Sequence, residues 1–530
     1  MAADRLAAKG VQMKKLPTLP IFPLVSVVGA GDIEDGLAAF DKKNYAVAIT
    51  KFRLSAAQGN AIGQCNLGLI YGIGQGVVQD YAEAVKWYEL AAAQGDEIAQ
   101  FNLGQNYDNG EGVVRNFSEA MKWYKLAAVQ GNVLAQFNIG QNYDNGKGVV
   151  RDSVEAVKWY KLAAVQGNAD AQLNLGAMYN NGEGVVQDCV EAVRLYKLAA
   201  EQDNASAQFN LGVMYGNGQG VVQNYDEALK WYTLSAAQDH TSAQFNIGNM
   251  YRKGQGIVQD YVEAMKWYKL AAAHGHAFAQ SNLGVMYSDG QCVVQDYAEA
   301  VKWFKLAAAQ GRASAQFNLG VMYGKGQGVV QDYAEAVKWY KLAAAQGDVI
   351  AQFNLGFMYS DEQGVVQDYA ESMKWYKLAA AQGDAIAQHN IGFMYRNGQG
   401  VVQDYAEAMK WYKLAAAQGD KKAQSNLGAM YNNGEGVVQN YAEAVKWYKL
   451  AAVQNDALAQ SNLGVMYAKG QGVVQDYTLA YMWTYFAVIN GNVMAVKNRD
   501  IMEEKMTPQQ IAEAEKLARE CQARNFKNCD

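Results

Sequence analysis

The chain has 530 residues, a formal net charge of −6 and 50% hydrophobic residues. It contains no stripe of basic residues, so a nucleic acid is not an expected partner. A single globule of this length would be unusual, whereas a one-dimensional array of repeats has no such limit on its length.

Residues 1–31 differ from the rest of the chain. Lys14 and Lys15 precede a short apolar run that ends at the small residues Gly29 and Ala30. This order is typical of a secretory signal, and we expect export to the periplasm or the exterior. The alternative is a disordered or surface-packed leader of a cytoplasmic protein. Three prolines interrupt the run, which is too short and too broken to span a membrane as a stable helix.

A 36-residue pattern fills most of the remaining chain. Its Asn-Leu/Ile-Gly core first occurs at Asn66 and recurs every 36 residues up to Asn462 without an insertion. A fixed period in this range indicates a solenoid, in which each repeat buries its apolar face against its neighbours. Twelve repeats are expected over residues 61–491. Residues 32–60 match a truncated N-terminal capping repeat that lacks the glycine loop.

Each repeat predicts two helices joined by a glycine loop. In the repeat at 315–350, Leu319 and Met322 lie on one apolar face of the first helix. Asp332, with Glu335 three residues later, is an N-cap arrangement for the second helix. A glycine after the second helix suits the left-handed residue that ends it. The repeat is therefore helix, loop, helix and tight turn.

The loop has the form Gly-x-Gly-Val-Val in most repeats. It is not a phosphate-binding loop, because no strand precedes it and no Lys-Ser/Thr pair follows it. Two repeats depart from the pattern: Glu362 replaces the first glycine and Cys292 the second. We expect these two loops to be less regular than the others.

The last residues predict a C-terminal helical cap over 492–530. Thr507 followed by Pro508 and Gln510 is the pattern of a helix start, with threonine as N-cap, proline at the first position and glutamine at the third. Cys521 and Cys529 are close in sequence, and in an oxidising compartment they could close a short disulfide loop.

The repeated residues Ala-Gln-x-Asn-Leu-Gly-x-Met-Tyr, Gly-x-Gly-Val-Val-x-Asp-Tyr-x-Glu-Ala-x-Lys-Trp-Tyr and Ala-Ala-x-Gln-Gly resemble the Sel1-like repeat, a relative of the tetratricopeptide repeat. The resemblance covers about residues 33–490. It implies an all-α, right-handed superhelical solenoid that acts as a protein-interaction scaffold. Some relatives carry a cysteine pair in each repeat, and these include proteins that bind or cleave β-lactams. This chain lacks such pairs.

No set of residues in the sequence forms a catalytic arrangement. A Ser-His-Asp or Cys-His group does not occur at a suitable spacing. His240 and His276 lie one period apart, but no cysteine or acidic cluster accompanies them as metal ligands. We therefore expect no enzyme activity, no cofactor and no metal site.

One face of the first helix carries the variation between repeats. Positions equivalent to 314, 317, 321 and 324 change from repeat to repeat, and their spacing places them together. Phenylalanines and arginines, which are usual interface anchors, recur there. We expect this face to line a concave groove; the alternative is that the phenylalanines pack between first helices as secondary core. The candidate partner-binding residues are Phe101, Phe137, Phe209, Phe245, Arg252, Phe278, Phe317, Phe353, Phe357, Phe393 and Arg396.

The sequence thus predicts a monomeric, non-enzymatic scaffold that binds a protein or peptide in the groove. Two alternatives stay open at this point. One is a β-lactam-binding or β-lactam-hydrolysing enzyme like the cysteine-rich relatives. The other is a structural spacer of the cell envelope.

Overall fold

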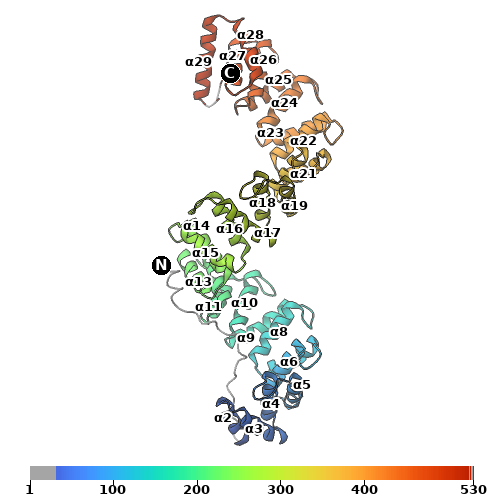
Figure 1. The fold of residues 1–530 in the computed structure, drawn as a ribbon, viewed down its shortest axis with the longest axis vertical. Coiled ribbons are helices and arrows are strands. Elements are labelled where there is room, and N and C mark those ends of the chain that lie inside the picture. Colours follow the sequence, from blue (N-terminus) through green and yellow to red (C-terminus); the bar gives the residue numbers. More distant parts are fainter. Residues whose placement is uncertain (1–30, 525, 527–528, 530) are drawn as a thin grey trace. The chain divides into compact units, whose positions relative to one another are not determined.

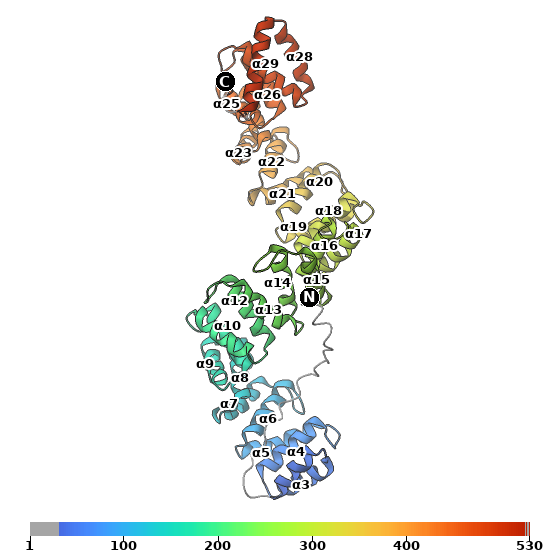
Figure 2. The same ribbon diagram turned by 90° about the vertical axis from the view of Figure 1, so that its left-hand side faces the viewer.

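The computed structural model describes residues 31–524, 526 and 529, so the leader expected at residues 1–31 lies almost wholly outside the described part. Every regular element in that part is an α-helix. The described residues divide into two compact units, one up to residue 276 (unit 1) and one from residue 277 onward (unit 2). Within each unit the helices follow one another in chain order, as the colours in Figure 1 and Figure 2 show. The sequence prediction of an all-α solenoid of 36-residue repeats is confirmed.

The helices of unit 1 are α2 (Gly31–Asp41), α3 (Tyr45–Ala57), α4 (Ala61–Ile73), α5 (Tyr81–Ala93), α6 (Glu97–Asn109), α7 (Phe117–Val129), α8 (Val133–Asn145), α9 (Ser153–Val165), α10 (Ala169–Asn181), α11 (Cys189–Ala200), α12 (Ala205–Asn217), α13 (Tyr225–Ala236), α14 (Thr241–Lys253) and α15 (Tyr261–Ala273). Those of unit 2 are α16 (Ala277–Asp289), α17 (Tyr297–Ala309), α18 (Ala313–Lys325), α19 (Tyr333–Ala345), α20 (Val349–Ser360), α21 (Tyr369–Ala381), α22 (Ala385–Asn397), α23 (Tyr405–Ala417), α24 (Lys421–Asn433), α25 (Tyr441–Ala452), α26 (Ala457–Lys469), α27 (Tyr477–Ile489), α28 (Val493–Glu503) and α29 (Pro508–Ala523). From α4 to α27, even-numbered helices are the first and odd-numbered helices the second of each repeat.

Local sequence signals set the helix ends. The Asp332 carboxylate accepts a hydrogen bond from the backbone N–H of Glu335 at 2.9 Å, so it is the N-cap of α19. Glu335 in turn pairs with Lys338 at 2.7 Å on the exposed side of the helix. Gly347 follows α19 with a φ of 91°, in the left-handed region that glycine adopts freely. The predicted N-cap at Asp332 and the predicted left-handed glycine after the second helix are confirmed.

The core of each repeat forms where a tyrosine of the second helix packs on a glycine of the first. Tyr340 is buried, and a Cβ atom at Gly320 would lie 2.5 Å from its ring. The absence of a side chain at Gly320 is therefore what lets α19 approach α18. Leu319 and Met322 are buried beside this contact. Burial of a side chain of this size stabilises the fold by about 1.5–3 kcal/mol.

Buried glutamines tie consecutive helices together. The Nε2 of Gln346, at the end of α19, donates to the Oε1 of Gln316 in α18 at 2.7 Å. The next first helix continues the pattern, because the Nε2 of Gln352 in α20 donates to the carbonyl oxygen of Ala344 at 3.1 Å. Gln316 donates likewise to the carbonyl oxygen of Ala308 at 3.3 Å, so it contacts the second helix on either side of it. We call this series the glutamine ladder.

The C-terminal helices differ from the repeats. Thr507 and Gln510 form a reciprocal capping box at the start of α29, as the sequence predicts. A disulfide joins Cys521 to Cys529. The ring of Phe526, within the loop that this bond closes, lies 4.9 Å from that of Phe486 in α27. The covalent link therefore holds Phe526 against the core of the final repeat.

Among the described residues, no helix combines the length and the apolar character that crossing a membrane requires.

Candidate functional site

The candidate site is the varying face of the first helices, which we call the first-helix face. It is defined by the positions equivalent to 314, 317, 321 and 324. The structure places the predicted residues of this face in three different settings.

The phenylalanines at position 317 pack within their own repeat. The ring of Phe317 lies 5.9 Å from that of Tyr340, the same tyrosine that covers Gly320. Phe101 makes the equivalent contact with Tyr124 and is only 3% exposed, so its ring belongs to the core. Four others are half-buried in the same geometry: Phe137, Phe209, Phe245 and Phe353. These rings therefore pack against the tyrosines of the second helices and expose only part of their surface on the first-helix face.

The phenylalanines at positions 314 and 321 are exposed. Phe357 and Phe393, from consecutive first helices of unit 2, are 43% and 45% exposed. Phe278 is 48% exposed, and the guanidinium of Arg312 lies 3.6 Å from the centre of its ring. Phe357 and Phe393 therefore have the accessible aromatic surface that a partner can cover.

The two predicted arginines differ in their partners. Arg396 pairs with Glu435 at 2.8 Å; burial disfavours its charge, but the hydrogen bond to Glu435 outweighs that effect and raises the pKa of the guanidinium. Arg252 instead donates from Nε to the hydroxyl of Tyr268 at 3.2 Å. Its charge is not neutralised by a carboxylate among the described residues. Arg252 is thus better suited than Arg396 to meet a negative group.

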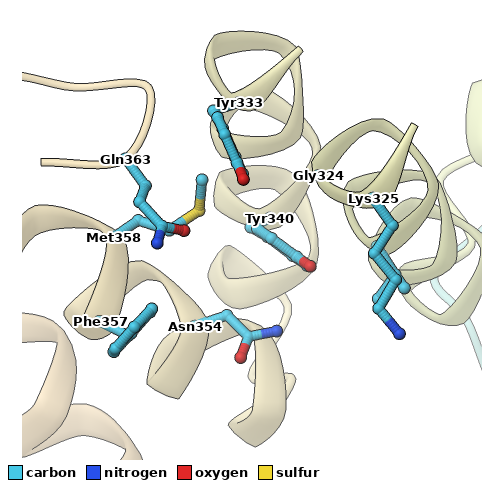
Figure 3. Close-up of a pocket in the computed structure, with 9 residues that line it drawn as sticks. Gly324, Lys325, Tyr333, Tyr340, Asn354, Phe357, Met358 and Gln363 are labelled. Atoms are coloured by element: carbon cyan, nitrogen blue, oxygen red, sulfur yellow. The ribbon is translucent and has the colours of Figure 1, made fainter. Parts of the chain in front are cut away.

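A recess opens on the first-helix face of unit 2, between α18 and α20. It has a volume of about 380 Å³ and lies beside Gly324. Figure 3 shows its walls: Lys325 from α18, the two tyrosines of α19, and Phe357 from α20. The complete lining is Val321, Gly324, Lys325, Tyr333, Tyr340, Asn354, Phe357, Met358 and Gln363. We call it the unit 2 recess.

A second recess, of about 290 Å³, occupies the equivalent place in unit 1. It lies beside Gly216, which is 108 residues, or three repeats, before Gly324. Its lining is Gly216, Asn217, Gln223, Tyr225, Ala228, Tyr232, Asn246, Asn249, Met250, Lys253 and Gln255. We call it the unit 1 recess. The same helix arrangement thus yields both recesses.

Glycine at position 324 is not required by packing. A Cβ atom at Gly216 would lie 3.8 Å from its nearest neighbours, the Cβ of Ala228 and the hydroxyl of Tyr232, which is ordinary van der Waals contact. A glycine inside a helix costs about 1 kcal/mol relative to alanine. Most other repeats have a larger residue here, such as Asn180 or Arg252. The missing side chain leaves space at both recesses.

The hydroxyls of Tyr340 and Tyr232, one in each recess, stay protonated at physiological pH. Burial raises the pKa of Tyr340 to about 12, with a smaller opposing effect from its hydrogen bond to Asn354. Burial likewise raises the pKa of Tyr232 to about 12, again opposed by an asparagine, Asn246. In Figure 3 the hydroxyl of Tyr340 points to the side of the recess where Asn354 and Lys325 lie. Both recesses therefore offer neutral hydroxyl and amide groups beside a lysine.

His240 and His276 lie at the turns between repeats. The rings of His240 and His276 stack on Phe209 and Phe245, with centroids 4.7 and 4.6 Å apart. In the described part of the chain, no group of three or more His, Cys, Asp and Glu side chains is placed to hold a metal ion.

The recesses are the feature that sequence reasoning missed. Sequence reasoning selected the arginines at position 324 as candidates and did not consider the glycines at that position. Both recesses, however, lie beside a glycine. A glycine in a helix where most other repeats carry a side chain was the available signal. The position of Asn354 is asparagine in every repeat, and Asn354 also lines the unit 2 recess.

Comparison with known proteins identifies the repeats. The family model described as Sel1 repeat matches residues 61–96, 98–132, 133–168, 169–204, 205–240, 241–276, 277–311, 313–348, 349–384, 385–420, 421–456 and 457–492. No curated protein matches the chain.

Two solved structures of bacterial proteins are similar to this chain. A protective antigen of uropathogenic Escherichia coli strains, described as displaying an SLR fold, is 35% identical; the match covers 83% of this chain and 96% of that protein, with a TM-score of 0.71. A Sel1 repeat protein from Oxalobacter formigenes is 32% identical over 66% of this chain and 98% of its own, with a TM-score of 0.48. The family-model matches and the likeness to the Escherichia coli antigen show that the chain belongs to the Sel1 repeat family, whose repeats generally form scaffolds for protein interactions.

Proposed function

We propose that the protein is a non-enzymatic scaffold that binds a partner protein or peptide in a groove along its first-helix face. The observation that carries this proposal is the exposure of Phe357 and Phe393 in consecutive first helices. Exposed aromatic side chains are frequent anchors of protein interfaces. The unit 2 recess lies beside Phe357 and has room for a side chain of the partner.

The chemistry of the recesses supports binding rather than catalysis. Their described lining consists of amides, phenols, lysines and apolar groups, and includes no Ser, Cys, His, Asp or Glu. These are the residue types that act most often as nucleophiles and as general acids or bases. Neutral donors and acceptors beside apolar walls are what recognition of a polypeptide requires.

The test removes the aromatic surface without disturbing the helices. Phe357→Asn and Phe393→Ala introduce residues that other repeats carry at this position, Asn249 and Ala429. The partner would be captured from extracts of the native host and quantified by mass spectrometry. We expect the double variant to capture at least tenfold less partner than the wild type does. Retention of the partner by the double variant would rule out this surface as the binding site.

The matched control alters apolar surface elsewhere. Val402 is 89% exposed in the loop between α22 and α23, away from the residues that line the recess. Val402→Asn therefore changes the exposed apolar area by a similar kind of substitution. We expect this variant to capture the partner as well as the wild type does.

We also propose that the protein is exported to the periplasm or the exterior. The support comes from the disulfide between Cys521 and Cys529, because disulfides persist in oxidising compartments, and from the basic and apolar order of the leader. Cell fractionation with mass spectrometry of the N-terminus and of both cysteines tests this. A protein found in the cytoplasm with both thiols reduced would contradict it.

A further inference from the structure

The two recesses share a scaffold but differ in their chemistry. In the unit 1 recess, Asn249 stands where Phe357 walls the unit 2 recess. Lys253 of the unit 1 recess stands where the later repeat has Asp361. Both recesses thus have one lysine, Lys253 or Lys325, but the other lining side chains of the unit 1 recess are mainly amides and phenols, whereas the unit 2 recess has the aromatic ring of Phe357 in its wall.

The positive charge of the unit 1 recess is not neutralised within the described chain. Lys253 lines the recess, and among the described residues no carboxylate lines it. The lysine at the position equivalent to 338 in the second helices behaves differently, since it pairs with the glutamate three residues before it, as Lys230 does with Glu227. Arg252, the neighbour of Lys253, also bonds to a hydroxyl rather than a carboxylate. The recess is thus lined by the positive charge of Lys253, and Arg252 precedes it in the chain without lining the recess.

Hydrogen-bond donors converge on the same space. The hydroxyl of Tyr225 accepts from Nε2 of Gln223 at 3.1 Å, which leaves its own proton to donate. The Oδ1 of Asn249 accepts from the hydroxyl of Tyr268 at 2.8 Å, which leaves its NH₂ group to donate. With the ammonium of Lys253, these groups form a set of donors. A carboxylate, which accepts several hydrogen bonds and carries a negative charge, complements that set.

We propose that the unit 1 recess binds the side-chain carboxylate of an aspartate or glutamate in an acidic linear segment of a partner protein. This inference rests on the proposed function, because it assumes that the first-helix face binds a polypeptide. It adds to that function a preference for a negative side chain at one defined place. The unit 2 recess, by its aromatic wall, takes an apolar side chain.

Selection from a random library of 12-residue peptides on the immobilised full chain tests the preference. We expect Asp and Glu to be enriched at least threefold among peptides selected by the wild type, and this enrichment to disappear with Lys253→Asn. Asparagine occupies this position in several repeats, as Asn217 does, so the variant is expected to fold. Lys325→Asn, at the unit 2 recess, is the matched control and should keep the enrichment.

Fluorescence anisotropy then measures the contribution of a single carboxylate. For the strongest selected peptide, changing its acidic residue to the amide should weaken binding to the wild type at least tenfold. The same change should weaken binding to Lys253→Asn less than twofold. Gly216→Asn, which copies Asn180 and fills the recess, should behave like Lys253→Asn. An analogue with phosphoserine in place of the acidic residue should bind no tighter than the carboxylate peptide.

The outcomes separate the two proposals. If the chain selects peptides that depend on Phe357 but show no acidic preference, or if Lys253→Asn keeps the full loss on amide substitution, the carboxylate site is wrong and the proposed function stands. A phosphoserine peptide that binds tenfold tighter also overturns the carboxylate assignment. If no peptide binds at all, the proposed function fails and the inference fails with it.

Discussion

Glu362 has a φ of +57°, in the left-handed region, at a loop position where the other repeats of the array carry glycine. A residue with a Cβ atom is strained there by about 1–2 kcal/mol. Glycine removes the strain but gives the unfolded chain more freedom, which offsets part of the gain. We expect Glu362→Gly to raise the free energy of unfolding by about 1 kcal/mol. Urea denaturation of the full chain, followed by circular dichroism, measures it.

The reverse substitution serves as control. Gly398 has a φ of +68° at the equivalent loop position, and a Cβ there would meet its nearest neighbour at 3.4 Å, an ordinary contact. Gly398→Ala should therefore destabilise the chain through its backbone angle alone, by about 1 kcal/mol. If both variants and the wild type unfold at the same urea concentration, these loops relieve the backbone strain without loss of stability.

His240 makes stability depend on pH. Burial lowers the pKa of its ring, and its Nδ1 accepts a hydrogen bond from the N–H of Ala243 at 3.3 Å as the N-cap of α14. The unfolded chain therefore binds the proton more readily than the folded one. The contribution of His240 to the free energy of unfolding is therefore fully present above about pH 6.5, the pKa of a histidine in an unfolded chain. It is lost as the pH falls below that value.

We expect His240→Asn to lose less stability than the wild type when the pH is lowered from 7.5 to 5.5. Asparagine caps the preceding first helix as Asn204 and does not titrate. Urea midpoints at both pH values provide the measurement. The same fall in both proteins would assign the pH dependence to other groups.

Single residues show where sequence reasoning reaches its limit. The N-cap at Asp332 was predictable because it depends on neighbours in the chain. The setting of Phe317 was not, because it depends on the Tyr340 ring lying over Gly320 and leaving an edge for the phenylalanine to pack on. Residue type alone could not distinguish Phe317 from the more exposed Phe357.

Among the elements, α14 and α15 lack one contact that the other pairs make. His274 replaces the glutamine that ends the second helix, and the Oε1 of Gln244, which is 3% exposed, has no hydrogen-bond partner. In the preceding repeat the equivalent Gln238 donates to Gln208 at 3.0 Å. A buried acceptor without a donor costs about 1–3 kcal/mol.

We expect His274→Gln to restore this rung of the glutamine ladder and to raise the free energy of unfolding by about 1 kcal/mol. Gln238→His is the mirror variant and should destabilise by a similar amount. Hydrogen exchange of α14 and α15 would localise the gain. Unchanged exchange in both helices would mean that the restored glutamine does not form the bond.

The helices themselves were predictable to within a few residues, because each repeat has the same apolar periodicity, N-cap residues and glycines. The loop at Cys292 was expected to be irregular, yet α16 ends at Asp289 and Cys292 keeps a left-handed φ of 57°. Glu362 did change its loop, since α20 ends one residue early at Ser360. Packing of a loop on its neighbours, which one repeat does not encode, decides between these outcomes.

At the scale of the whole molecule, we expect the chain to tolerate the deletion of one complete 36-residue repeat. Each repeat contacts mainly its neighbours, so removing 36 residues joins two surfaces that match. Deleting residues 133–168 places Asn132 directly before Ala169, where it replaces Asn168 as N-cap. Gln172 then meets the carbonyl of Ala128 in place of that of Ala164.

We expect this 36-residue deletion to keep the mean residue ellipticity at 222 nm within about 5% of the wild-type value, because it removes one complete helix pair from a nearest-neighbour array, and to lower the urea midpoint only slightly. Deleting residues 133–150, half a repeat, removes α8 and leaves α9 without the first helix on which Tyr160 packs. That variant should lose helical signal well beyond its missing residues and should aggregate. Equal damage from both deletions would show that the chain folds as one body rather than as a sum of repeats.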